Sequence, residues 1–200
     1  MIKQLIIIGK GGHSKVCLDI ALQKYDKVFF LDDNCIEGVL GPISEYKKYV
    51  KNSDFFVAIG NNETRERVSN SLHGANIVSL IHKNAIVAKD AFINCGTVIM
   101  AGAVVNSNAT IGKGCIINTC SSIDHDNVVG DYSHVSVGSH LAGTVHLGKR
   151  VLVGAGSTII NNVSICDNVI IGAGSLVIDN IIQSGTFFGV PAVLHKKSKK

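Results

Sequence analysis

The chain has 200 residues, 46% of them hydrophobic and 17% charged, with a formal net charge of +4 at pH 7. This apolar content excludes a chain that is disordered throughout, and it is sufficient for one large domain or two small ones. Much of the positive charge lies in the terminal HKKSKK (195–200), so the composition does not indicate a nucleic-acid-binding protein. No apolar run reaches the roughly 18–20 residues that a membrane-spanning helix needs.

The chain opens on MIKQLIIIGKGGH, which lacks a signal-peptide cleavage site and is typical of a buried strand. Six cysteines are spread without a CxxC pair or a framework spacing, at positions 17, 35, 95, 115, 120 and 166. This pattern indicates reduced thiols, and we therefore expect a cytoplasmic protein.

Residues 1–76 are expected to form a small Rossmann-like α/β domain. Buried strands are predicted at 3–8, 27–33 and 54–60, and helices at about 14–24 and 61–72. Strand–helix alternation of this kind is typical of a parallel sheet, which binds ligands at the carboxyl ends of its strands.

The three predicted strands end at Gly9–His13, at Asp32–Asp33 and at Gly60–Asn62, so these loops should converge on one site. The three glycines of the first loop would let its backbone approach a phosphate at a helix N-terminus. The loop is not a full GxGxxG, because its sixth position is Ser14. A domain this small favours a mononucleotide, or a nucleotide joined to a sugar, over a whole dinucleotide.

Beyond residue 76 the chain has a six-residue repeat. Every sixth residue from Ile81 to Val177, seventeen positions in all, is Ile, Leu or Val. This period fits neither a helix nor an alternating strand, but it is typical of a parallel β-helix whose stacked coils bury a continuous aliphatic column. We assign 77–182 to this β-helix, with a junction at 79–82, and 183–200 to a C-terminal segment with a basic tail.

The segment 118–143 gathers three acids and three histidines among small and β-branched residues. Within it the sequence DHD places His125 between Asp124 and Asp126. A histidine held by a carboxylate is a suitable general base near neutral pH. On spacing alone, a surface histidine flanked by acids is an equally good interpretation.

The chain resembles a known family in a set of motifs that run in order along nearly its whole length: GKGGHSKVCLDI, FLDDN, FFVAIGNNETR, the hexapeptides, NTCSSIDHDN, GDYSHVSVGSHLAG and FFGVPA. The family is the left-handed β-helix (hexapeptide-repeat) acetyltransferases that act on nucleotide-linked amino sugars and on sialic acid. The motifs are most similar to those of the bacterial enzymes that N-acetylate UDP-linked 4-amino sugars for bacillosamine-type glycans.

The resemblance implies a homotrimer with active sites between subunits, acetyl-CoA as co-substrate and no metal. It implies transfer of an acetyl group directly to the 4-amino group of a UDP-linked 4-amino-4,6-dideoxy sugar. By matching positions, His125 is the general base and Asp126 orients it and raises its basicity. The implied acetyl-CoA contacts are His134, Ala155 and Ala173, and the implied contacts to the nucleotide sugar are Gly11, Gly12, His13, Asp32, Asp33 and Gly60. The family commonly carries Glu where this chain has Asp124 and Asp126, which leaves the contact of the shorter acid open.

The 18-residue coil implied by the family allows further expectations. Gly143 lies one coil beyond His125, so its N–H could face a substrate carbonyl without a side chain intervening. Ala155 and Ala173 should stack in one column, suited to a pantetheine arm. Asn118 is either a polar support for catalysis or an asparagine that satisfies the turns of the coil.

Three alternatives stay open. The first is O-acetylation of sialic acid or a related sugar, in which the base would act on a hydroxyl. The second is a metal-dependent hydratase on the same fold, although His134, His140 and His146 should point from three different faces of one coil. The third is a non-catalytic scaffold that binds a nucleotide sugar.

Overall fold

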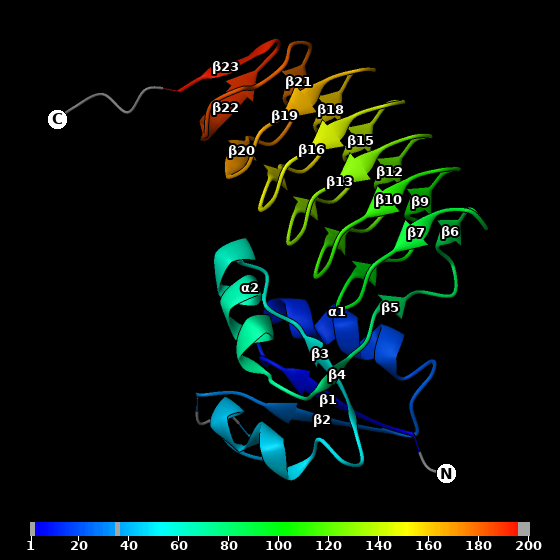
Figure 1. Cartoon of the computed structure of the whole chain (residues 1–200), viewed down its shortest axis with the longest axis vertical. Helices are drawn as coiled ribbons and strands as arrows, with labels where there is room; N and C mark the ends of the chain where they lie inside the picture. Colours follow the sequence, from blue (N-terminus) through cyan, green and yellow to red (C-terminus); the bar gives the residue numbers. More distant parts are fainter. Residues whose placement is uncertain (1–2, 35–36, 196–200) are drawn as a thin grey trace, which may run out of the picture.

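The computed structural model describes residues 3–34 and 37–195. The expectations for Cys35 and for most of the basic tail therefore lie outside the described residues. Figure 1 shows a small α/β unit at one end and a column of short-stranded coils above it, with the last described strand, residues 192–194, at the far end.

The α/β unit is a parallel sheet in the order β2-β1-β3-β4 with two α-helices. Its elements are β1 (Gln4–Ile8), α1 (Gly12–Ala21), β2 (Lys27–Leu31), the 3-10 helix η1 (Ile43–Lys48), β3 (Asp54–Val57), α2 (Asn62–Ser71) and β4 (Asn76–Ile77). The three predicted strands and both predicted helices are confirmed. The sequence prediction missed η1 and the short edge strand β4, because neither has a clear periodic pattern.

Alternation along β1 divides the apolar side chains between the two faces of the sheet. Leu5 and Ile7 pack with α1 on one face, while Ile6 and Ile8 pack on the other with side chains of η1 and α2. The face with α1 also contacts the first coils of the column, through a shared cluster that includes Leu80. Both faces of the sheet are therefore covered, as a parallel sheet requires.

The rest of the chain is a parallel β-solenoid built from three sheets (Figure 1). The eight-stranded sheet holds β5 (Leu80–Ile81), β8 (Val98–Ile99), β11 (Ile116–Ile117), β14 (His134–Val135), β17 (Leu152–Val153), β20 (Val169–Ile171), β22 (Gly185–Gly189) and β23 (Ala192–Leu194). The six-stranded sheet holds β6 (Ile86–Val87), β9 (Val104–Val105), β12 (Ser122–Ile123), β15 (His140–Leu141), β18 (Thr158–Ile159) and β21 (Leu176–Val177). The five-stranded sheet holds β7 (Phe92–Ile93), β10 (Thr110–Ile111), β13 (Val128–Val129), β16 (His146–Leu147) and β19 (Ser164–Ile165).

Strand pairing confirms the 18-residue coil. Ile116 pairs with His134, and Ser122 pairs with His140, each one coil further on. The aliphatic column fills the centre: its members from Ile99 to Val177 are at most 3% exposed. Ile81, at the first coil, is 46% exposed because no coil lies below it. The six-residue period therefore correctly predicted which side chains the coil buries.

From Gly96 to Gly174, every sixth residue of the solenoid has left-handed backbone. Glycines take many of these positions, and Asn108, Asp126 and Asn162 take others, with φ near 60°. Short polar side chains tolerate this conformation better than most. The left-handed sense of the coil and the domain boundaries given above stay predictions.

Over the part of the chain that the structure describes, no helix combines the length and apolar character needed to cross a bilayer.

Candidate active site

The three loops at the carboxyl edge of the first sheet converge, as the sequence predicted. They line a pocket of about 450 Å³, which we call the loop pocket, with contributions from Gly11, Gly12, His13, Asp32, Asp33 and Gly60. A side chain added at Gly11, Gly12 or Gly60 would meet no atom within 4 Å, so the backbone there is open to a ligand.

The two acids of the loop pocket also hold its walls. The carboxylate of Asp32 accepts hydrogen bonds from the backbone N–H of Lys10 at 2.6 Å and of Asn34 at 2.8 Å. Asp33 accepts one from the backbone N–H of Ile43 at 2.9 Å. These contacts tie the β1–α1 loop and the start of η1 to the end of β2.

His125 and Asp126 form the pair that the sequence indicated. The His125 ring lies in the turn between β12 and β13, with Nδ1 at 2.7 Å from Oδ2 of Asp126. Asp124 accepts a hydrogen bond from the His125 backbone N–H at 2.8 Å. The hydrogen bond to Asp126 raises the pKa of His125, and the charges of both acids add to this effect. The Nδ1–H is thus directed at a carboxylate, and Nε2 carries the free lone pair of the neutral ring.

Gly143 lies directly beside the His125 ring. A side chain there would place Cβ at 2.6 Å from both Cε1 and Nε2 of His125. Among the described residues, no hydrogen bond uses the Gly143 N–H. The Nε2 edge of His125 therefore faces backbone that only glycine leaves clear.

A second cavity, which we call the coil pocket, shares Gly60 with the loop pocket. It measures about 550 Å³ and lies between the start of α2 and the outer side of the eight-stranded sheet, where His134, Ser136, Leu152 and Ile170 line it. His134 is largely buried there. Burial, together with the charges of Arg65 and His13, lowers the pKa of His134 to about 3.

Asn118 contacts His134 and not His125. Its Nδ2 lies 3.0 Å from Nε2 of His134, and its Oδ1 accepts the backbone N–H of Thr119 at 2.8 Å. Within one chain, Asn118 therefore supports the coil pocket.

Ala155 and Ala173 stack as expected: the N–H of Gly174 donates to the Ala155 carbonyl at 2.8 Å, one coil apart. Both are exposed at the corner between the eight-stranded and six-stranded sheets. His125 lies at the next corner, between the six-stranded and five-stranded sheets. One chain thus carries the two halves of the predicted site on different corners.

Arg65 of α2 is a residue that the sequence analysis missed. It is 1% exposed and donates to the carbonyls of Ile59, Gly60, Gly114 and Tyr132 and to Oδ1 of Asn62. Burial lowers its pKa to about 10, which leaves it charged at neutral pH. Its charge adds to burial in lowering the pKa of His13 to about 4. No local pattern marks it, because two of its acceptors, the carbonyls of Gly114 and Tyr132, belong to residues distant in sequence.

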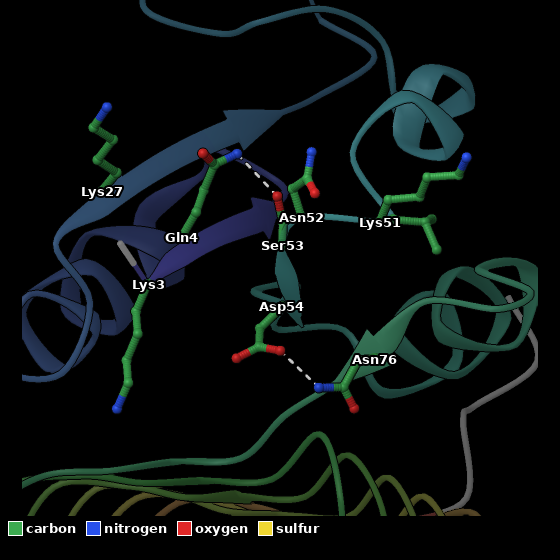
Figure 2. A pocket seen from close by; sticks show the side chains of 9 residues that line it. Lys3, Gln4, Lys27, Lys51, Asn52, Ser53, Asp54 and Asn76 are labelled. Carbon is green, nitrogen blue, oxygen red and sulfur yellow. Dashed lines mark hydrogen bonds between the residues drawn. The ribbon is translucent and has the colours of Figure 1, made fainter. Parts of the chain in front are cut away.

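Another cavity, of about 660 Å³, lies at the opposite edge of the first sheet. Figure 2 shows Asp54 there bonded to Asn76, and Gln4 to Ser53, while the lysines point away from one another. These side chains do not converge on a ligand, and the loops with the candidate residues lie at the other edge.

Within 3–34 and 37–195, no three side chains of His, Cys, Asp or Glu gather closely enough to hold a metal ion. His134, His140 and His146 begin β14, β15 and β16, which belong to three different sheets.

Two family models match the chain. One, described as the PglD N-terminal domain, matches residues 4–72, and the other, described as bacterial transferase hexapeptide (six repeats), matches residues 144–179. Over 112 residues the chain is 37% identical to the UDP-N-acetylbacillosamine N-acetyltransferase of Bacillus subtilis (strain 168). That match covers 50% of this chain and 52% of the relative, so the chain spans about half the length of the curated relative it matches.

Solved structures match over nearly the whole chain. The acetyltransferase domain of PglB from Neisseria gonorrhoeae FA1090, in complex with acetyl coenzyme A, is 32% identical with a TM-score of 0.92, covering 98% of this chain and 100% of that one. PerB from Caulobacter crescentus, in complex with CoA and GDP-perosamine, is 32% identical with a TM-score of 0.91, covering 98% and 99%.

Proposed function

The chain belongs to the family of hexapeptide-repeat acetyltransferases that carry a PglD N-terminal domain, and we propose that it is an acetyl-CoA-dependent sugar N-acetyltransferase. Its acceptor is the 4-amino group of a UDP-linked 4-amino-4,6-dideoxy sugar. The observation that carries the proposal is the His125–Asp126 pair at 2.7 Å, with its free ring edge over Gly143.

The loop pocket takes the nucleotide. Its open glycines and the N-terminus of α1 suit a diphosphate, because backbone N–H groups and the helix dipole favour negative charge. The coil pocket shares Gly60 with the loop pocket and continues toward the solenoid, which suits a sugar directed away from its nucleotide. The acceptor named for the B. subtilis relative supports UDP, whereas the Caulobacter relative was solved with a GDP sugar.

In the proposed reaction the sugar amine attacks the thioester carbonyl directly. His125 Nε2 removes a proton from the amine, a C–N bond forms and the C–S bond breaks. The imidazolium returns the proton to the departing sulfur, so CoA leaves as its thiol. The free N–H of Gly143 stabilises the oxyanion of the intermediate.

Acetyl-CoA would lie along the exposed column of Ala155 and Ala173. Because this column and His125 occupy different corners of the coil, the complete site needs a second copy of the chain. We therefore propose a homotrimer with active sites between subunits, as closed rotational symmetry would provide. A cytoplasmic location, where acetyl-CoA and nucleotide sugars are made, belongs to the same proposal.

The test is a thiol-release assay with acetyl-CoA and a panel of acceptors: UDP-linked 4-amino-4,6-dideoxy sugars, GDP-perosamine, and free and CMP-linked sialic acid. Turnover should occur with a UDP-amino sugar and should fall about 10²–10⁴-fold in His125→Ala, the usual range for a lost general base. Turnover on sialic acid alone would replace the proposal with O-acetylation. No turnover with any acceptor, together with zinc bound to the purified protein, would favour a metal-dependent hydratase.

A further inference from the structure

The side-chain amide of Asn118 has a fixed orientation. Its Oδ1 accepts the backbone N–H of Thr119 at 2.8 Å, and it also lies 3.4 Å from the Thr119 hydroxyl. A backbone N–H can only donate, so the amide oxygen must face it. The amide nitrogen therefore faces the His134 ring, at 3.0 Å from Nε2.

This orientation selects one tautomer of His134. An amide nitrogen is a donor only, so Nε2 must be the bare, accepting nitrogen, and the proton of the neutral ring must lie on Nδ1. The ring stays neutral because it is largely buried, with Arg65 of α2 and His13 of α1 as the charged or titratable groups that act on it. The charged residues Glu63 and Arg150 also line the coil pocket.

The Nδ1 side of the ring opens to the coil pocket. Among the described residues, no hydrogen bond is made by His134 Nδ1. In this described part of the chain, Asn127 Oδ1 is the only fully buried side-chain N or O atom that lacks a hydrogen bond. Since His134 Nδ1 also lacks one, it is not fully buried and is accessible. Since His134 lines the coil pocket, its Nδ1–H is presented to whatever occupies that cavity.

We propose that Asn118 is a positioning residue that holds His134 as the neutral tautomer with its proton on Nδ1, so that His134 offers a hydrogen-bond donor to a substrate oxygen in the coil pocket. Naming that oxygen rests on the proposed function: it is the carbonyl oxygen of the acyl group, which would reach the sugar amine in the coil pocket. As the amine attacks, this oxygen gains negative charge and would accept from His134 as well as from the Gly143 N–H of the second copy. Asn118 acts only through His134.

The tautomer can be read directly by NMR of the full chain labelled with ¹⁵N-histidine, with His134 assigned by substitution. In the wild type, His134 should show a protonated Nδ1 and a bare Nε2 from about pH 5 to pH 8, because a buried histidine of lowered pKa does not charge there. In Asn118→Asp the carboxylate is an acceptor only, so the proton should move to Nε2.

Asn94→Asp is the matched control. Asn94 accepts the N–H of Cys95 at 2.8 Å in the same kind of turn, with no histidine beside it. This variant should leave the His134 signals and the turnover unchanged. A wild-type proton on Nε2, or no change of His134 in Asn118→Asp, would overturn the inference.

Measurements of turnover distinguish the loss of the His134 Nδ1–H donor from a general loss of packing at this position. An asparagine at 134 can place an N–H near the position of Nδ1, whereas a glutamine reaches the position of Nε2. His134→Asn should keep kcat within about threefold and His134→Gln should lower it about tenfold or more, in line with one lost hydrogen bond. Equal loss in both would overturn the assigned donor. Because the tautomer is read without turnover, a protein with the expected proton on Nδ1 and no acetyl transfer would overturn the proposed function alone.

Discussion

At the scale of single residues, the space beside His125 depends on Gly143. An added Cβ would lie 2.6 Å from the ring, and this glycine does not have a left-handed backbone, so alanine can adopt its conformation. The His125 side chain is 55% exposed, which leaves the ring free to move away from a new methyl group. A substitution at Gly143 therefore acts on the position of the ring more than on the fold.

We expect Gly143→Ala to change the free energy of unfolding by less than about 1 kcal/mol, as for a surface substitution. Acetyl transfer should fall about 10–100-fold, because a displaced base no longer reaches the amine. Urea unfolding and the rate of thiol release would measure the two effects. Unchanged turnover would show that the ring acts from another position.

Asp126 controls the basicity of His125. The hydrogen bond between them raises the pKa of His125, and His125 acts as a base only when unprotonated. Turnover should therefore rise with pH through the pKa of His125. In Asp126→Asn, which loses the charge and tolerates the left-handed backbone, that pKa falls and the rising limb should move to lower pH.

The plateau of Asp126→Asn should also fall by about threefold to tenfold, because a weaker base removes the proton less well. The pH profile of kcat/KM measures both changes. Asp124→Asn is the comparison: the Asp124 carboxylate accepts from the His125 backbone N–H and from Nδ2 of Asn106 but does not bond the His125 ring, so its profile should move less. If the rising limb of the pH profile does not shift in Asp126→Asn, a group other than His125 controls the pH dependence.

At the scale of elements, α2 is fixed to the solenoid by Arg65. The guanidinium bonds carbonyls at the end of β3 and carbonyls of two successive coils. Among the ion pairs of the described residues, none includes Arg65. Its five N–H groups thus replace a counterion with hydrogen bonds, and they hold the Gly60 loop that the two pockets share.

Arg65→Met should lower the free energy of unfolding by about 3 kcal/mol or more, because it leaves several buried carbonyls without donors. Arg65→Lys should recover only part of this, since an ammonium cannot reproduce the guanidinium fork. Asn70→Ala is the control on the same helix; it removes only a 3.4 Å contact from the Tyr132 hydroxyl. Urea unfolding of the three variants is the measurement, and equal stabilities would contradict the assignment.

At the scale of the whole molecule, the two halves of the site lie on different corners of the coil. If a site combines His125 of one copy with the Ala155 column of another, two inactive variants can complement each other. His125→Ala and Ala155→Trp, refolded together in equal amounts, should recover activity at about a quarter of the sites by random assembly in a closed trimer. Each variant refolded alone is the control. No recovery in the mixture would place the complete site within one chain.

The sequence by itself determined the architecture and the contact between His125 and Asp126. A strict six-residue period repeats the same burial in every coil, so Ile99 and Val177 have the same environment although they are far apart. His125 and Asp126 are adjacent in the chain, and loops that follow parallel strands must meet at one edge. Each of these features depends on neighbouring residues or on a regular repeat, and both can be recognised directly in the sequence.

Only the tertiary structure decided the partners of the buried polar groups. Arg65 reaches Gly114 and Tyr132, which are 49 and 67 residues away, and Asn118 meets His134 across successive coils. Such contacts depend on which side chain faces which carbonyl once the α/β unit packs on the solenoid. Hydrogen bonds to backbone atoms leave no residue pattern in the sequence, so the orientation of Asn118 and the tautomer of His134 follow from packing alone.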